Sequence, residues 1–179
     1  VCNWLLERLV RTARQLGPDQ VWADTVMARW LWEPDNLDLP CFLANDDVRT
    51  GYHLERWQQE APPSLAELCS RFLDRRLLKA LAVEHLGSED QLKALAIAGR
   101  LAESIGLDPS SCCGLRHQQI RGYHPYKGGI RLWNGRRLQA LEQASALVAS
   151  LSTPAETTWL IHPREIHEDL EAALDGEGF

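Results

Sequence analysis

The chain has 179 residues, 45% of them hydrophobic, so it can bury a core as one domain or as two small lobes. It carries 19 Lys and Arg against 25 Asp and Glu, a net charge of −6, which argues against a protein that coats nucleic acid. No stretch approaches 18 uncharged apolar residues, and the five cysteines lack the even spacing of a disulfide framework. We therefore expect a soluble cytoplasmic protein with no membrane partner.

Apolar residues at helical spacing dominate the first part of the chain. Residues 1–16 predict an amphipathic helix that Gly17 and Pro18 stop. A second helix is predicted over residues 18–31, and residues 34–40 are rich in turn formers and predict a linker. The first residue is Val and the first helix begins without a cap, so we expect the chain to be the C-terminal part of something longer.

Asn45 is predicted to cap the next helix, with Asp46 and Asp47 in its first turn. Two adjacent carboxylates are also compatible with a metal site, but neighbours on a helix point in different directions, and the capping role is sufficient. The two helices after it each begin with a capping box, Ser64 with Glu67 and Ser88 with Gln91. In the first of these helices, apolar residues follow at helical spacing to residue 81. In the second they follow to residue 105, with Leu92 on the apolar face.

After Gly106 the pattern changes from helical spacing to alternation. The segments predicted are a hairpin turning at Asn134-Gly135, a helix over 145–151, a strand over 157–161 and a closing helix from Pro163. The fold class predicted is α+β and predominantly helical. Its helical N-terminal two-thirds should pack on a small antiparallel sheet, built from residues after about Leu115, with a C-terminal helix.

Residues 109–141, named here the basic window, contain no Asp or Glu. Six cations lie in it: Arg116, Arg121, Lys127, Arg131, Arg136 and Arg137. Rings and glycines between the cations allow close backbone approach, which favours a site for phosphates or nucleotides. The alternative is a hairpin with a solvated basic face.

Other chemistry is less well supported by the sequence. Cys112, Cys113, His117 and His124 form the one cluster of soft ligands, but zinc sites usually use separated Cys pairs, so a buried thiol pair is the favoured interpretation. Neither a G-x-S-x-G nucleophile motif nor a P-loop occurs. We predict no catalytic residue and no metal ligand in this chain.

Three segments in order carry a resemblance to a known family. They are FLANDD ahead of Trp57, RFLDRRLLK at 71–79, and the tail IRLWNGRRLQALEQASALVASL with WLIHP at 130–163. This order and spacing resemble the region downstream of the catalytic domain in HD superfamily phosphohydrolases, the group that includes the sterile-alpha-motif/HD deoxynucleotide triphosphohydrolases and their bacterial relatives. The resemblance implies three parts: residues 1–17 as the closing helix of a truncated HD catalytic domain, 18–110 as a helical region, and 111–179 as a small α+β lobe.

The resemblance also implies where the chemistry lies. The family's metal is bound by a His, a His-Asp doublet and a later Asp, and all four would precede Val1; no His-Asp dipeptide occurs in this chain. The chain would then be the regulatory and assembly portion of a metal-dependent HD phosphohydrolase acting on nucleotides. We expect it to be inactive alone, with the divalent metal in the missing HD domain.

In the triphosphohydrolases of this family a basic residue near the C-terminal strand reaches a regulatory nucleotide between subunits. The resemblance makes Lys127 the nearest candidate, followed by Arg121 and Arg131, and we expect self-association. Two alternatives stay open: an independent nucleic-acid- or nucleotide-binding module, or a purely structural dimerisation domain that uses a tryptophan surface of Trp22, Trp30 and Trp32.

Overall fold

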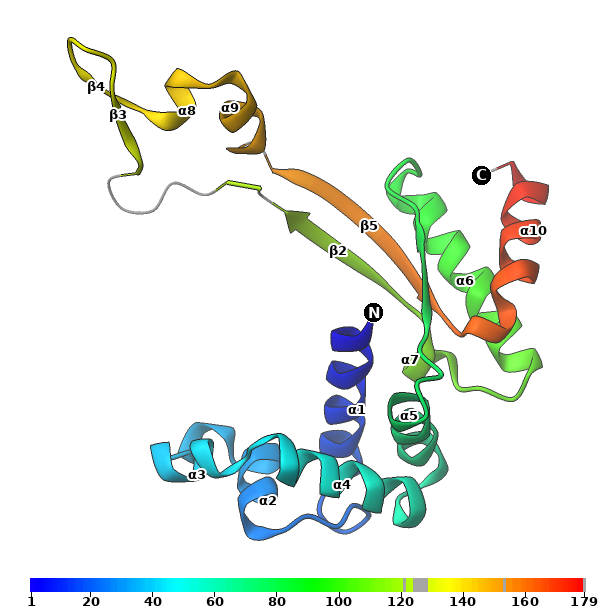
Figure 1. Cartoon of the computed structure of the whole chain (residues 1–179). Helices are drawn as coiled ribbons and strands as arrows, with labels where there is room; N and C mark the ends of the chain where they lie inside the picture. The colour runs from blue at the N-terminus through cyan, green and yellow to red at the C-terminus, as the bar shows by residue number, and fades with distance from the viewer. Residues whose placement is uncertain (121, 124–128, 153, 179) are drawn as a thin grey trace.

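The computed structural model describes residues 1–120, 122–123, 129–152 and 154–178. The chain begins with a block of helices in which α1 and α4 both pack against α5 (Figure 1). Its elements are α1 (Cys2–Leu16), α2 (Thr25–Trp32), the 3-10 turn η1 (Pro34–Asn36), α3 (Leu39–Ala44), α4 (Asp47–Glu60) and α5 (Pro63–Leu73). The end of α1 is as predicted, because Gly17 adopts a φ of 79° that other residues rarely reach.

A three-stranded antiparallel sheet follows, in the order β1-β5-β2. Its strands are β1 (Lys79–Ala82), β2 (Gly114–Ile120) and the central β5 (Ala155–His162). The register pairs Ala80 with Ile161 and Arg116 with Trp159. Helix α6 packs on β5, β2 and α10, and the elements around the sheet are α6 (Ser88–Ser104), α7 (Pro109–Cys112), η2 (Arg164–Ile166) and α10 (His167–Glu177).

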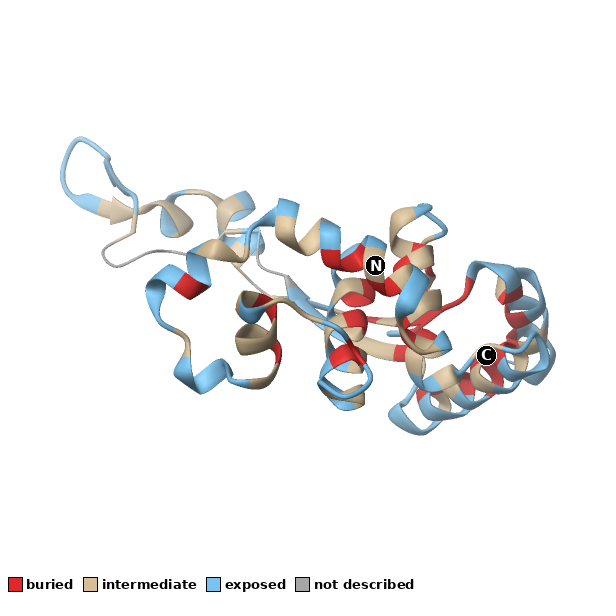
Figure 2. Cartoon of the chain, turned by 90° about the horizontal axis from the view of Figure 1, so that it is seen from below, coloured by how far each residue is buried: buried red, intermediate tan, exposed pale blue. Residues whose placement is uncertain are grey.

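Residues 129–152 form an arm at the far end of the β2–β5 pair, as Figure 1 shows. The arm consists of β3 (Arg131–Trp133), β4 (Leu138–Ala140), α8 (Leu141–Ala144) and α9 (Ala146–Ser152). Tyr123 N donates to Leu151 O at 3.0 Å, which ties α9 to the chain after β2. No residue of the arm is buried, and in Figure 2 the buried residues lie in the rest of the molecule.

One apolar core joins the helical block to the sheet. It draws on α1, α2, α4, α5, α6, β5 and α10, and its members include Trp4, Leu5, Leu9, Leu31, Trp57, Leu65, Leu68, Leu160, Ile161, Ile166 and Leu170. The structure confirms the predicted fold class, because helices predominate and the sheet is small and antiparallel. None of the helices in the described residues combines the length and apolar character needed to cross a bilayer.

The predicted helix over residues 65–81 ends early. Helix α5 stops at Leu73, Arg75 takes a positive φ of 56°, and β1 begins at Lys79. The prediction that the sheet is built from residues after Leu115 is therefore wrong, since one edge strand comes from the 18–110 region. Strand β1 exists because it pairs with β5, a contact that helical spacing within residues 65–81 does not reveal.

The second predicted helix begins later than residue 18. Asp24 caps α2, with its side chain accepting a hydrogen bond from Met27 N at 2.8 Å. The carbonyl of Trp22 instead accepts a hydrogen bond from the indole of Trp57 at 2.6 Å, so a long-range contact holds residues 18–24 out of the helix. Residues 34–40, predicted to be a linker, contain η1 and the start of α3.

Several predicted caps are also wrong. Asp46, not Asn45, caps α4 by accepting from Arg49 N at 2.8 Å. Neither Ser64 nor Ser88 caps its helix with its side chain. Gln91 is turned inward instead, where its Nε2 donates to the carbonyl oxygens of Val83 and Leu86, so the buried face of α6 is rotated and Leu92 is 61% exposed.

The hairpin prediction is confirmed, with its turn shifted by one residue. Asn134 N donates to Arg137 O at 3.2 Å, so Gly135 and Arg136 are the two central residues. Gly135 has a φ of 88°, and the side chain of Asn134 accepts hydrogen bonds from the backbone of Arg136 and Arg137. The helix predicted over 145–151 is present as α9, separated from α8 by Ser145.

Candidate functional site

Alternation along the sheet brings a cation, an amide and an indole to one face. Arg116 and Gln118 of β2 share a face with Trp159 and Ile161 of β5, because paired residues in antiparallel strands point to the same side. Ala80 of β1 extends this face and carries only a methyl group, which leaves space above it. The opposite face, which contains Leu160, is covered by the packing of α6.

This open face forms one wall of a pocket of about 490 Å³, named here the sheet-face pocket. The other wall is the first turn of α1, and the lining residues are Val1, Cys2, Asn3, Ala80, Arg116, Gln118, Trp159 and Ile161.

The charge of the sheet-face pocket comes from Arg116. Within the described part of the chain, Arg116 forms no ion pair, and no residue lining the pocket is acidic. Its guanidinium can hold a phosphate by charge-assisted hydrogen bonds, while Trp159 offers an aromatic surface to a flat group. The arrangement is suited to binding an anion with a ring attached.

Close contact between α1 and β2 fixes the depth of this pocket. A Cβ atom on Gly114 would lie 2.8 Å from the Trp4 ring and 3.1 Å from Arg8, so only glycine lets the helix approach. The Arg8 guanidinium lies over the Trp4 ring at 4.7 Å. Burial, together with repulsion from Arg11, lowers the pKa of Arg8.

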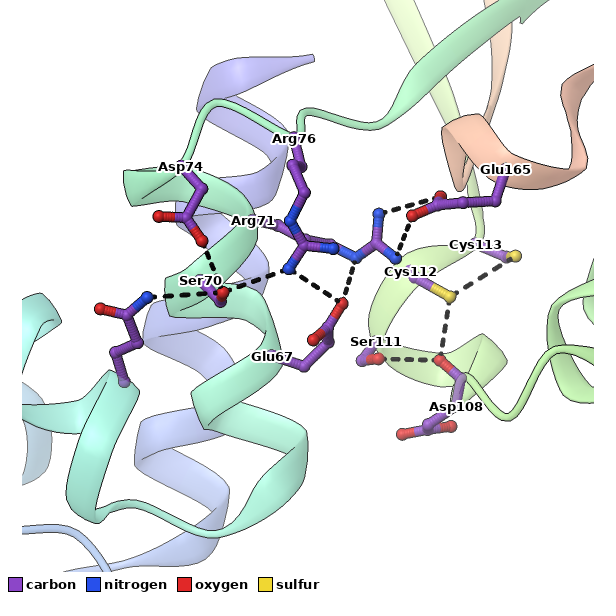
Figure 3. A network of polar contacts seen from close by, with 11 residues as sticks. Glu67, Ser70, Arg71, Asp74, Arg76, Asp108, Ser111, Cys112, Cys113 and Glu165 are labelled. Atoms are coloured by element: carbon purple, nitrogen blue, oxygen red, sulfur yellow. Dashed lines mark hydrogen bonds and ion pairs between the residues drawn. The ribbon is translucent and has the colours of Figure 1, made fainter.

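A buried arginine joins the helices to the end of β5, as Figure 3 shows. Arg71 of α5 is 2% exposed, and its two terminal nitrogens donate to the two carboxylate oxygens of Glu165 at 3.0 and 3.1 Å. Arg71 Nε forms an ion pair with Glu67 Oε1 at 2.9 Å. Partial burial raises the pKa of Glu165, but the hydrogen bonds and charge of Arg71 outweigh it and hold that pKa below its ordinary value.

The two adjacent thiols lie in the same region (Figure 3). Cys112 Sγ and Cys113 Sγ are buried and 4.0 Å apart, and Cys112 Sγ donates to Asp108 O at 3.1 Å. The hydrogen bond from Cys113, with help from the charge of Arg71, lowers the pKa of Cys112. The same hydrogen bond, together with burial, raises the pKa of Cys113. His117 contacts Thr158 instead, at 2.9 Å, and His124 lies outside the described residues.

No metal site follows from these side chains. The described residues contain no group of three or more His, Cys, Asp or Glu side chains placed to bind a metal ion. Asp46 and Asp47, considered as a ligand pair, are exposed at the start of α4, where Asp46 serves as the cap.

The three residues predicted to contact a nucleotide lie in different parts of the chain. Lys127 and Arg121 lie outside the described residues. Arg131 is exposed on β3, and Figure 1 places β3 at the end of the arm, away from the first turn of α1. The sheet-face pocket instead uses Arg116, a cation of the basic window that the sequence did not single out, and Trp159 from a distant strand. Alternation within residues 114–120 is the signal that could have pointed to Arg116 and Gln118.

No family model matches the chain, and no curated protein matches it. Among solved structures, it is similar to a phosphohydrolase from Bacteroides thetaiotaomicron, with a TM-score of 0.68 and 18% identity. The match covers 91% of this chain and 45% of that one, so this chain spans less than half the length of the phosphohydrolase. At this identity the similarity shows a shared fold.

Proposed function

We propose that this chain is the C-terminal regulatory and assembly portion of a metal-dependent HD phosphohydrolase that acts on nucleotides, and that a regulatory nucleotide binds in the sheet-face pocket. The shared fold with a bacterial phosphohydrolase supports this proposal, as does the extent of the match, because more than half of that phosphohydrolase has no counterpart here. A catalytic unit can lie in that part.

The observation that carries the proposal is the chemistry of the sheet-face pocket. Arg116 offers a positive charge and several N–H donors, which suits a phosphate group. Trp159 and Gln118 add a ring face and a hydrogen-bonding amide, which suit a base. Cys2 is the one thiol among the lining side chains, and no lining residue is a His, Asp or Glu that could serve as its general base, so the pocket is proposed to bind a nucleotide and not to hydrolyse it.

The divalent metal and its ligands are assigned to the HD domain of the parent protein. The described residues of this chain do not fit such a metal, because they lack a suitable ligand group. When bound in the parent, a divalent metal would polarise a phosphate and activate water.

Titration of deoxynucleoside triphosphates into the purified chain, followed by calorimetry, tests the proposal. We expect a dissociation constant on the order of 0.2 mM, about −5 kcal/mol, since part of the site would come from elsewhere in the parent. Arg116→Ala should weaken binding about tenfold, because it removes a charge-assisted contact. Arg100→Ala, at an exposed position of α6, is the control and should change nothing.

Two results would contradict the proposal. Binding that Arg116→Ala leaves unchanged would remove the sheet-face pocket as the nucleotide site. Binding to any oligonucleotide with a steep dependence on salt would favour the alternative of a nucleic-acid-binding module.

A further inference from the structure

An apolar groove of about 440 Å³ lies between α1, α2, α3 and α4. Among its lining residues are Leu6, Val10, Trp30, Phe42, Leu43 and Asn45. Phe42 is 58% exposed and Leu43 66% exposed, so α3 presents large apolar side chains to solvent at the rim of the groove. An exposed apolar patch of this kind usually marks a contact surface.

The hairpin of β3 and β4 is the other exposed apolar feature of interest. Trp133 at its tip is 65% exposed, and Leu132 and Leu138 flank it with their side chains also in solvent. Trp133 has the size and aromatic character of residues that anchor protein contacts in apolar pockets.

The two features carry opposite charge. Residues 33–47, which include α3, contain Glu33, Asp35, Asp38, Asp46 and Asp47 and no Lys or Arg. The hairpin contains Arg131, Arg136 and Arg137 and no acid. Within the described residues these three arginines form no ion pair, and the acidic segment has only the Asp38–Arg29 pair, at 3.3 Å. Such complementarity steers association and fixes its register.

A polar group in the groove also lacks a partner. The side-chain oxygen of Asn45 is shielded from solvent and accepts no hydrogen bond from the described residues. A buried acceptor without a donor is costly. The indole N–H of Trp133 is a donor on an otherwise apolar side chain, which matches a groove lined by apolar side chains together with Asn45, Asp47 and Thr50.

We propose that two copies of this chain associate by placing the hairpin of each, with Trp133 leading, into the groove beside α3 of the other. Figure 1 shows the hairpin and α3 as separate projections of one copy, so the contact is assigned between copies. Each copy has one hairpin and one groove, and reciprocal docking therefore closes a dimer instead of growing a filament. The proposal deepens the assembly half of the proposed function and does not depend on the sheet-face pocket.

Two variants, one with the charge of the hairpin reversed and one with the charge of the groove segment reversed, test this proposal. Each is studied alone and in a mixture with the other, by sedimentation velocity at low salt. One variant combines Arg131→Glu, Arg136→Glu and Arg137→Glu. The other combines Glu33→Lys, Asp35→Lys and Asp47→Lys, which avoids the capping residues Asp38 and Asp46 and changes the net charge of residues 33–47 from −5 to +1. We expect the wild type to dimerise and each variant alone to dimerise at least tenfold more weakly. An equimolar mixture should regain association, since the Glu-substituted hairpin then meets a segment 33–47 of net charge +1 and the wild-type hairpin meets one of net charge −5.

The apolar part is tested with Trp133→Ser, which should also weaken dimerisation at least tenfold. The matched control is Leu92→Ser, at a similarly exposed apolar position on α6, and it should leave dimerisation unchanged. Circular dichroism verifies that each variant is folded. A wild type that stays monomeric, dimers that persist in the variants, or a mixture that stays monomeric would each overturn the proposal. Nucleotide binding is measured separately, so failure here leaves the sheet-face pocket unaffected.

Discussion

Arg71 is a charged residue in the interior that connects two distant parts of the chain, α5 and η2. Arg71→Met keeps the apolar stem and removes the guanidinium, which leaves Glu165 without its partner and Glu67 with only Arg76, at 3.8 Å. We expect the free energy of unfolding to fall by about 2–3 kcal/mol, less than for a fully buried pair because both carboxylates reach solvent. Urea denaturation measures it, and Arg11→Met, in an exposed pair with Glu7, should cost less than about 1 kcal/mol.

Glu165 gives the same contact a pH dependence. Its pKa in the folded state lies below its ordinary value, so its contribution to stability is present above the ordinary glutamate range, about 4.3, and is lost as pH falls through the folded-state pKa. The difference in unfolding free energy between the wild type and Glu165→Gln should therefore shrink between pH 7 and pH 3. A difference that stays constant over this range would show that the carboxylate charge does not stabilise the fold.

At the scale of elements, the contact between α1 and β2 shapes the sheet-face pocket and depends on Gly114. Gly114→Ala places a methyl group against Trp4, and we expect a loss of about 1–3 kcal/mol from overpacking. Gly51→Ala is the matched control: Gly51 lies within α4 with nothing near a Cβ, and alanine there should stabilise by about 0.5–1 kcal/mol. Thermal unfolding compares the two, and equal effects would mean that α1 does not pack on β2 as described.

At the scale of the whole molecule, the proposed function predicts a chain that binds nucleotide without hydrolysing it. With millimolar Mg²⁺ or Mn²⁺ and deoxynucleoside triphosphate, we expect no phosphate or triphosphate release. We also expect no shift of the unfolding temperature by the metal alone, since the described residues lack a metal ligand group. Metal-dependent release that survives repurification would place catalytic residues in this chain and contradict the proposal.

Local pattern determined those elements whose signals lie within a few residues. Gly17 ends α1, Asn134-Gly135 marks the hairpin whose turn centres on Gly135 and Arg136, and the β-branched and aromatic residues of 157–161 form the centre of β5. The same local reasoning predicted a predominantly helical α+β fold, and the charge pattern alone drew attention to the basic window.

The tertiary structure alone decided where distant segments meet. Strand β1 forms because β5 lies beside it. Helix α2 starts at Thr25 because the indole of Trp57 donates a hydrogen bond to the carbonyl oxygen of Trp22. Among the cations of the basic window, Arg116 lies in the sheet-face pocket because its register with Trp159 turns it toward α1. Charge and periodicity are properties of neighbours in sequence, whereas a pocket depends on which strand pairs with which, and that is settled by the burial of one shared core.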